Sequence, residues 1–489
     1  MNTPKMIAMA VVLTSVVACD DDANEESASP VLSVTTEEGR TPADEAGEIE
    51  NPETDGSGDQ GGVTPPPEGG GSTGDDGAGG DDSGGSGSGG DGSSGGDQSG
   101  GGSEGGDSSD GSGDGDNPPP EPEPEPKVDI DGLALPDLSV TPDFEAYVDA
   151  QPRYYTRITA SFGNVAGQDT EPFENRMNNA GANLGRVLFY DKRLSQNNTV
   201  SCASCHQQQH GFSDPKVFSD GFEGGKTGRH SMSLSNARYY TPKSFFWDER
   251  AETLEQQVLM PIQDGVEMGM NLLDLEVKLR QTSFYGPLFT AAFGDEAITS
   301  ERIAQALAQF IRTMVTYQSK FDQAFTAGSW NDPDFEAVFT EQELLGLRLF
   351  SGVPGDRNGS LRCDTCHHTS AHTGDSSHNN GLDANTSDDE GAGGGFFKVP
   401  SLRNIEASPP YMHDGRFETL MDVVEFYNSG VQAHRNLAPI LRRNGSQSGP
   451  PARFNLTQQE KEALVAFMET LTDETFLTSP LFHDPFPQE

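Results

Sequence analysis

The sequence carries a five-residue pattern twice, as Cys202-Ala203-Ser204-Cys205-His206 and as Cys363-Asp364-Thr365-Cys366-His367. Two thiols separated by two residues can bond covalently to the two vinyl groups of a haem, and the adjacent histidine can then ligate the iron. A redox dithiol would have no use for that histidine, and a zinc site is the other alternative. The pattern therefore predicts two covalent haem c groups. Their expected attachment residues and axial ligands are Cys202, Cys205 and His206 for one haem, and Cys363, Cys366 and His367 for the other.

The sequence around these motifs repeats. The matching segments are residues 184–189 with 345–350, 233–236 with 401–404, and 247–254 with 413–420. Two stretches of similar plan, each with one cysteine pair, predict two related cytochrome c-like domains. We expect them at residues 128–328 and 329–489.

The helix signals are strong, whereas no stretch of alternating apolar residues predicts a strand. Residues 300–316 place apolar side chains on one helical face. Thr340 with Glu343, and Thr457 with Glu460, form capping-box patterns that mark helix starts. The expected fold is mainly α-helical with long loops.

The chain begins with features of an export signal. Lys5 precedes an apolar run at residues 6–17 that is too short to span a bilayer, and Ala18 then precedes Cys19. This arrangement resembles a bacterial lipoprotein signal, so we expect residues 1–18 to be removed and Cys19 to be lipidated. An ordinary signal peptide with an incidental cysteine is the alternative. Cys19 and the two haem-motif pairs account for all five cysteines, which leaves none for a structural disulfide.

Residues 19–127 are rich in Gly, Ser, Asp and Pro. From Asp20 to Lys127 there are 29 acidic residues against Arg40 and Lys127, so this segment accounts for most of the net charge of −47. Such a composition buries too little apolar surface to offset the entropy lost on ordering, which predicts a disordered tether. The acidic charge argues against nucleic-acid binding.

The repeat also reveals a difference between the two halves. Tyr427 stands fourteen residues after His413, whereas Pro261 stands fourteen residues after the matching Trp247. Tyrosine offers a phenol oxygen as an iron ligand, and proline offers none. One haem is therefore expected to have Tyr427 near its iron, and the other to have an open site as in an enzyme.

Several longer motifs make a family resemblance specific. They are the two haem motifs, Phe246-Trp247-Asp248-Glu249-Arg250, Glu267-Met268-Gly269, Phe397-Lys398-Val399-Pro400-Ser401-Leu402-Arg403-Asn404 and Tyr411-Met412-His413-Asp414-Gly415. From about residue 184 onward, the chain resembles the bacterial di-haem cytochrome c peroxidase/MauG family. The resemblance implies a peroxide-reacting haem in the N-terminal domain and an electron-entry haem in the C-terminal domain.

The resemblance also implies roles for single residues. Gln257, Pro261 and Glu267 match positions lining the family's peroxide pocket, where a carboxylate can move a proton and an amide can orient the substrate. Trp247 matches the tryptophan between the two haems, which can relay electrons. The plainer alternatives are a solvated surface acid for Glu267 and core packing for Trp247.

The chain departs from the family pattern at both haems. Many members carry a histidine that caps the peroxide-reacting iron, but His210 and His230 lie outside that motif and are interpreted as structural. We therefore predict that the first haem is open without prior reduction. At the second haem Tyr427 replaces the usual methionine, as in MauG. Ligation by Met412 or Met421 is the alternative.

Calcium is uncertain from the sequence. Ser408 and Pro410 match backbone positions that bind calcium in the family, but His230 replaces an expected asparagine, and imidazole is a poor calcium ligand. The nearby His368, His372 and His378 lie in a polar stretch and are expected to be solvated.

Together these features predict a protein of the periplasm or cell surface, anchored to a bacterial membrane through Cys19. The leading hypothesis is reduction of hydrogen peroxide with electrons from a small c-type cytochrome or cupredoxin. The alternatives are peroxide-dependent oxidation of a partner protein, as in MauG, and pure electron transfer.

Overall fold

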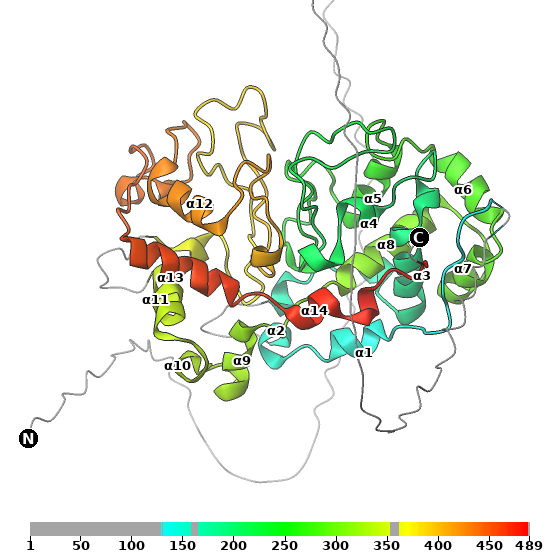
Figure 1. The fold of residues 1–489 in the computed structure, drawn as a ribbon, viewed down its shortest axis with the longest axis horizontal. Helices are drawn as coiled ribbons and strands as arrows, with labels where there is room; N and C mark the ends of the chain where they lie inside the picture. Colours follow the sequence, from blue (N-terminus) through cyan, green and yellow to red (C-terminus); the bar gives the residue numbers. More distant parts are fainter. Residues whose placement is uncertain (1–128, 130, 158–164, 353–360, 488–489) are drawn as a thin grey trace, which may run out of the picture. The chain divides into compact units, whose positions relative to one another are not determined.

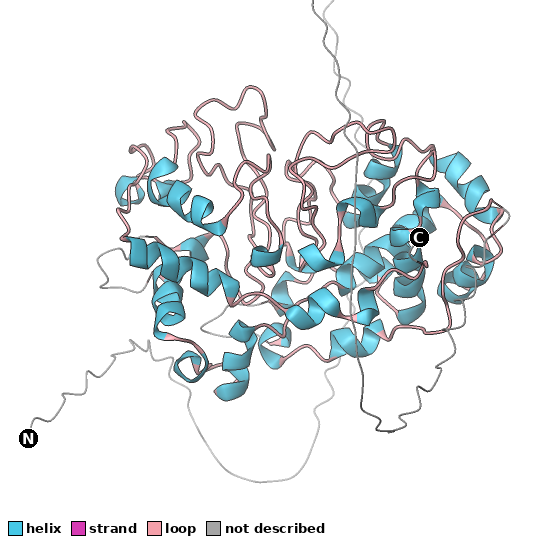
Figure 2. Ribbon diagram, viewed as in Figure 1, coloured by secondary structure: helices cyan, strands magenta, loops and turns pink. Residues whose placement is uncertain are grey.

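A computed structural model describes residues 129, 131–157, 165–352 and 361–487. The predicted signal peptide, lipidated cysteine and tether all lie outside these residues. The described chain is mainly helical and contains isolated β-bridges but no sheet (Figures 1 and 2). This confirms the expected fold class. Among the described residues, no helix has the length and apolar character needed to cross a membrane.

We refer to residues 131–328 as the first half and to residues 329–487 as the second half. The α-helices of the first half are α1 (Phe144–Asp149), α2 (Arg153–Thr156), α3 (Asn179–Tyr190), α4 (Cys202–Cys205), α5 (Leu254–Gln263), α6 (Leu272–Arg280), α7 (Tyr285–Phe293), α8 (Ser300–Thr313) and α9 (Lys320–Ala327). Those of the second half are α10 (Phe335–Val338), α11 (Glu341–Ser351), α12 (Leu420–Glu425), α13 (Gln458–Glu469) and α14 (Glu474–Thr478). A π-helical turn, η8 (Phe426–Gly430), directly continues α12.

The predicted helix starts are confirmed. Thr340 and Thr457 cap α11 and α13, and each forms a capping box with the glutamate three residues later. The helix expected at residues 300–316 is α8, which ends at Thr313. Its last turn is lost because residues 314–316 leave the helix and bond to other segments, including Asn236.

A close helix pair forms the centre of each half, α3 with α8 and α11 with α13. Both pairs depend on a glycine at the same place in the repeat. A Cβ atom added at Gly185 would lie 2.0 Å from the carbonyl oxygen of Ala306, and one at Gly346 would lie 1.9 Å from that of Ala463. No side chain fits in either contact, so glycine allows the helix backbones to touch.

An asparagine that follows each haem motif is repeated in the two halves. It bonds to the backbone just after the second helix of each central pair, α8 or α13. The side-chain oxygen of Asn236 accepts a hydrogen bond from the Thr316 N–H at 3.1 Å, just after α8. That of Asn404 accepts one from the Asp473 N–H at 2.8 Å, just after α13. Both asparagines have positive φ, at 59° and 62°. The internal repeat therefore extends to individual backbone contacts.

The two main hydrophobic cores exchange chain segments. Phe476 and Phe482, near residue 480, pack in the first core, where the Phe482 ring lies 5.8 Å from the Phe144 ring of α1. Figure 1 shows α14 and the chain that follows it beside α1. Conversely, Phe321 and Phe325 of α9 pack in the second core. The boundary near residue 328 remains a prediction, because each core draws residues from both sides of it.

A buried ion pair reinforces this exchange. The Arg403 guanidinium of the second half lies 2.7 Å from the Asp322 carboxylate of α9, and both side chains are buried. Removing one partner would leave an uncompensated buried charge, which typically costs about 3–5 kcal/mol.

Candidate haem sites and their shared wall

Each half contains one cavity lined by its cysteine pair and the following histidine. The cavity of the first half, with Cys202, Cys205 and His206, has a volume of about 590 Å³. The cavity of the second half, with Cys363, Cys366 and His367, has a volume of about 230 Å³. All four thiols are free of disulfides, so each pair is available for thioether bonds.

The proximal histidines are in the state that an iron ligand requires. The His206 Nδ1–H donates to the Phe212 carbonyl at 2.8 Å, which leaves Nε2 as the ligand atom. Burial lowers the pKa of His206, and it lowers the pKa of His367 to about 4, so both rings are neutral. Free thiols and neutral imidazoles in the spacing of a haem motif fit covalent haem c in both cavities.

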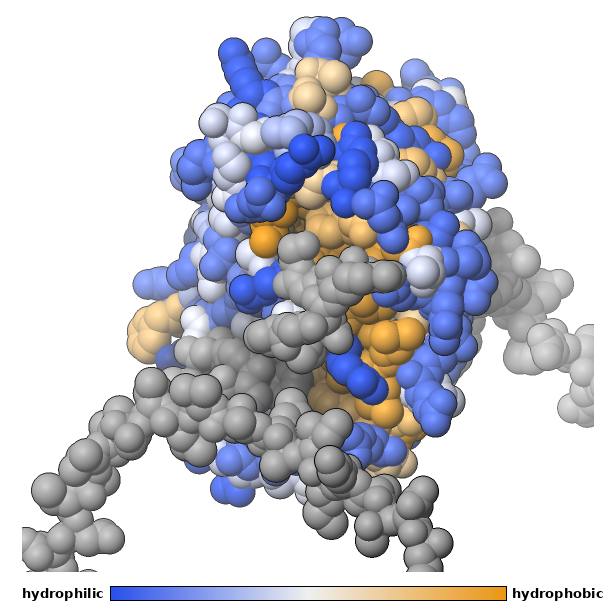
Figure 3. Space-filling view, turned by 90° about the vertical axis from the view of Figure 1, so that its left-hand side faces the viewer, coloured by the Kyte–Doolittle hydropathy of each residue, from blue (hydrophilic) through white to orange (hydrophobic). Residues whose placement is uncertain are grey.

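The second half offers an apolar setting for its haem. The face of the molecule that carries α11, α12 and α13 shows an area of apolar side chains (Figure 3). Helices α12 and α13 line the smaller cavity with Leu420, Val423, Val424, Leu464 and Met468. Such a lining suits the apolar face of a macrocycle.

The three residues expected at the peroxide pocket lie together in the larger cavity. Gln257 and Pro261 are four residues apart on α5 and therefore share one helical face, and Glu267 lies in the loop that follows. Burial and the nearby Asp264 carboxylate raise the pKa of Glu267 to about 7, although Arg250 opposes the shift. Glu267 is thus half-buried in a cavity rather than solvated, and it can take up or release a proton near neutral pH.

A wall separates the two cavities, and Trp247 is part of it. The residues that line both cavities are His230, Met232, Ser233, Trp247, Lys398, Val399, Pro400 and Ser401. The Trp247 indole N–H donates to the His230 carbonyl at 2.7 Å, and the Trp247 carbonyl accepts from the Lys398 N–H at 2.9 Å. The indole is thereby held between the two sites, where a relay would have to lie.

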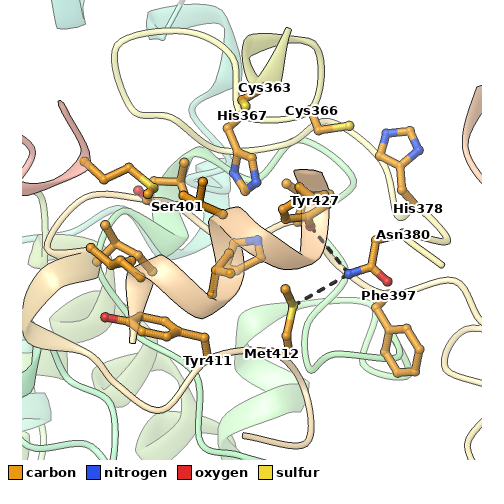
Figure 4. Close-up of a pocket in the computed structure, with 18 of the residues that line it drawn as sticks. Cys363, Cys366, His367, His378, Asn380, Phe397, Ser401, Tyr411, Met412 and Tyr427 are labelled. Carbon is orange, nitrogen blue, oxygen red and sulfur yellow. Dashed lines mark hydrogen bonds between the residues drawn. The ribbon is translucent and has the colours of Figure 1, made fainter. Parts of the chain in front are cut away.

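Two candidate distal ligands enter the smaller cavity. The Asn380 side-chain amide lies 3.5 Å from the Tyr427 hydroxyl oxygen and 3.6 Å from the Met412 sulfur (Figure 4). Burial raises the pKa of Tyr427 to about 12. Met421, the other methionine considered from the sequence, is not among the residues that line this cavity.

The expectation of a solvated histidine cluster is wrong. His372 is only 4% exposed and packs against Phe321, Phe350 and Phe467. His378 and His368 are half-buried, and His378 lines the smaller cavity. The repeat explains His372, because it follows His367 in nearly the same place as the buried Phe212 follows His206.

His210 and His230, which are predicted to be structural, have backbone hydrogen-bond partners. The rings of His210 and His230 hydrogen-bond to the Ala407 and Lys216 carbonyls, each at 3.1 Å. His230, Ser408 and Pro410 line the same cavity, yet the described residues contain no group of three or more His, Cys, Asp or Glu suited to a metal ion. Calcium therefore remains a prediction.

Sequence reasoning assigned no role to two residues at these sites. Lys398 is buried in the shared wall with its ammonium 3.3 Å from the centroid of the Tyr240 ring, and burial lowers its pKa to about 7. Lys398 belongs to the motif at residues 397–404 that supports the family resemblance, so the sequence did mark this residue as unusual. Asn380 follows two other polar residues, and nothing in the sequence distinguished it from a loop residue.

Comparison with known proteins agrees with this geometry. The sequence model of the family "Di-haem cytochrome c peroxidase" matches residues 179–329. The methylamine utilization protein MauG of Methylophilus methylotrophus is 33% identical over 310 residues, covering 61% of this chain and 84% of that protein. Cytochrome c551 peroxidase of Nitrosomonas europaea is 32% identical over 304 residues, covering 60% and 80%.

Solved structures show the same fold. The crystal structure of a MauG-like protein associated with microbial copper homeostasis aligns with a TM-score of 0.54 at 31% identity, covering 64% of this chain and 95% of that chain. The diheme peroxidase BthA from Burkholderia thailandensis E264 aligns with a TM-score of 0.50 at 25% identity, covering 64% and 92%. With two cysteine pairs placed for two haems, the chain belongs to the di-haem cytochrome c peroxidase/MauG family and is an oxidoreductase of the cytochrome c peroxidase type.

Proposed function

We propose that this protein reduces hydrogen peroxide to water at the larger cavity, with electrons that enter through the smaller cavity from a small c-type cytochrome or cupredoxin. The observation that carries the proposal is a half-buried carboxylate, Glu267, whose pKa of about 7 suits proton transfer in a cavity with spare volume. The reaction consumes one peroxide, two electrons and two protons and yields two water molecules.

The residues of the larger cavity have different roles in the proposed reaction. Haem bound at His206 would supply the redox-active iron. Glu267 takes a proton from one peroxide oxygen and returns it to the other, which already carries one hydrogen and therefore leaves as water. The two electrons and two external protons are then used to form the second water. The Gln257 amide hydrogen-bonds to the substrate and orients it. Pro261 has no ligand atom, so it leaves room for peroxide.

Electrons then cross the shared wall. Trp247 is held rigidly by hydrogen bonds at its indole nitrogen and its carbonyl oxygen, which fixes its position between the cavities. Its ring centroid lies 6.4 Å from that of His413, which lines the smaller cavity. This aromatic contact supports electron transfer from the second site to the first.

The first experiment is peroxide consumption by the protein with both haems attached, with a reduced small c-type cytochrome as donor. Catalytic oxidation of the donor supports the proposal. If both irons instead prove six-coordinate and no peroxide is consumed, the protein only transfers electrons.

A second candidate function is peroxide-dependent oxidation of a partner protein. Tyr427 in the smaller cavity supports it, because the resemblance assigns tyrosine to this position in MauG, and the similar protein of Methylophilus methylotrophus carries that name. The two functions are separated by adding peroxide without donor. A long-lived oxidised spectrum with slow donor turnover favours partner oxidation.

We also propose attachment to a bacterial membrane through lipidated Cys19, with the enzyme in the periplasm or at the cell surface. Support comes from the sequence alone, in Lys5, residues 6–17 and Ala18. Fractionation of cells that express Cys19→Ser tests it. Release of active protein from the membrane fraction is expected, and retention would contradict the anchor.

A further inference from the structure

Two side chains with iron-binding atoms share the smaller cavity. The Tyr427 hydroxyl oxygen and the Met412 sulfur both lie within 3.6 Å of one nitrogen atom, the side-chain amide of Asn380. Figure 4 shows dashed lines from the Asn380 amide to Tyr427 and to Met412, with Cys363, Cys366 and His367 in the upper part of the view. The smaller cavity therefore holds two side chains that carry possible ligand atoms.

The repeat shows that this pairing is particular to the second half. Met412 corresponds to Phe246 and Tyr427 to Pro261, and both counterparts line the larger cavity. Met412 and Phe246 even share a positive φ, at 76° and 70°, so the backbone aims both side chains alike. The first half has no ligand atom at either position, whereas the second half has one at both.

The two ligand atoms prefer different oxidation states of iron. An anionic phenolate is a hard donor that stabilises ferric iron, whereas a neutral thioether is a soft donor that stabilises ferrous iron. We propose that Tyr427 and Met412 exchange as distal ligand of the haem held by His367, with Tyr427 bound when the iron is ferric and Met412 bound when it is ferrous.

The exchange balances as a coupled transfer of one electron and one proton. Reduction by a one-electron donor would release Tyr427 as a phenolate, which would take one proton from solvent, and the Met412 sulfur would fill the position without a proton change. The reverse events accompany oxidation. The Asn380 amide can donate to whichever atom is free, so neither released side chain loses its partner.

The backbone permits this movement. Tyr427 lies on the π-helical turn η8, and Met412 lies in a separate loop between the bridged residues Tyr411 and Phe417. One side chain can therefore leave without displacing the other. Such π-helical turns are frequent at functional sites.

The test begins with the unaltered protein carrying both haems. Resonance Raman spectra of the oxidised protein are expected to show phenolate modes of an iron-bound tyrosine. After reduction with dithionite, proton NMR is expected to show a methionine methyl signal shifted far upfield by the haem ring. Tyrosine ligation in both states, or methionine ligation in both states, would overturn the proposal.

Three variants identify the residues. Met412→Leu is expected to abolish the shifted methyl signal and lower the reduction potential of this haem, with the oxidised spectrum unchanged. Tyr427→Phe is expected to place methionine on the ferric iron and raise the potential. Met421→Leu, a methionine outside the cavity, is the matched control and should change neither spectrum nor potential. A methyl signal that survives Met412→Leu but not Met421→Leu would overturn the assignment.

Voltammetry of the unaltered protein provides a test that needs no variant. Ligand exchange predicts two interconverting redox couples whose separation depends on scan rate, whereas a fixed ligand predicts one reversible couple. The inference rests on haem attachment at Cys363 and Cys366, which the absorption spectrum of the pyridine adduct measures separately. It does not depend on peroxide turnover, so a failed turnover assay would count against the proposed function alone.

Discussion

The two halves share a scaffold but differ where a helix passes the haem cavity. In the first half, α5 runs as an α-helix through Pro261 to Gln263. In the second half, the matching helix α12 ends at Glu425 and continues as the π-helical turn that carries Tyr427. The cavity volumes differ in the same sense, about 590 Å³ in the first half and 230 Å³ in the second. A small local change thus accompanies a larger volume in one cavity and the entry of a side chain with a ligand atom, Tyr427, into the other.

The largest effect is expected when the two haems are removed one at a time. Cys202→Ser with Cys205→Ser, and Cys363→Ser with Cys366→Ser, should each halve the covalent haem content and abolish peroxide turnover. Quantifying haem per protein by its pyridine adduct checks this. Only the variant that keeps Cys202 and Cys205 should still bind small ligands such as cyanide at an open iron. Cyanide binding to the other variant instead would reverse the assignment of the two sites.

Removing the acid of the larger cavity should have the next largest effect. Glu267→Gln keeps the shape but cannot transfer a proton, so steady-state turnover should fall by about 10²–10⁴-fold. Haem content and spectra should not change. Glu252→Gln, an exposed acid before α5, is the control and should retain full turnover. Equal activity in all three proteins would remove Glu267 from the mechanism.

Replacing Pro261 by tyrosine should make the larger cavity more like the smaller one, where Tyr427 stands at the matching position. Pro261→Tyr places a phenol where Tyr427 lies in the repeat, and we expect turnover to fall about tenfold or more because the iron becomes six-coordinate. Electron paramagnetic resonance should show loss of the high-spin ferric signal. A retained high-spin signal would mean that the π-helical turn, and not the residue type, brings Tyr427 to its cavity.

The pKa of Glu267 predicts a pH dependence. Its raised pKa of about 7 keeps the carboxyl protonated below that pH, and only the ionised form can accept the first proton from peroxide. Turnover should therefore rise about tenfold per pH unit below pH 7 and level off above it. The same rise in Glu267→Gln, measured on its residual activity, would assign the titration to another group.

The smallest effect should fall on stability, and equally in both halves. Gly185→Ala and Gly346→Ala force a methyl group against the Ala306 and Ala463 carbonyls, which should lower the free energy of unfolding by about 1–3 kcal/mol each. Gly228→Ala, with no atom near its added methyl, should be neutral. Thermal unfolding measures all three. A large difference between the first two would mean that the halves do not share this packing.

Local patterns predicted much of the helical framework. Thr340, Thr457 and residues 300–316 carried their signals within one or two helical turns, and the structure confirms those helices. The haem motifs likewise predicted which side chains meet in each cavity, because their chemistry fixes a short spacing.

The prediction that failed concerned His372, which is buried by residues that are distant from it in the sequence. We predicted a solvated His372 because its neighbours in sequence are polar. Its ring is instead buried by aromatic residues of α9, α11 and α13. Aligning it with Phe212 would have revealed this. The contact of Asn380 with both Tyr427 and Met412 had no such signal, since it joins three separate segments.

The packing of Phe476 and Phe482 into the first core has a consequence for biosynthesis. The first half is synthesised well before these two rings, so its core stays incomplete until residues 476–482 have been made. The first core is thus completed by a segment that follows the entire second haem motif along the chain.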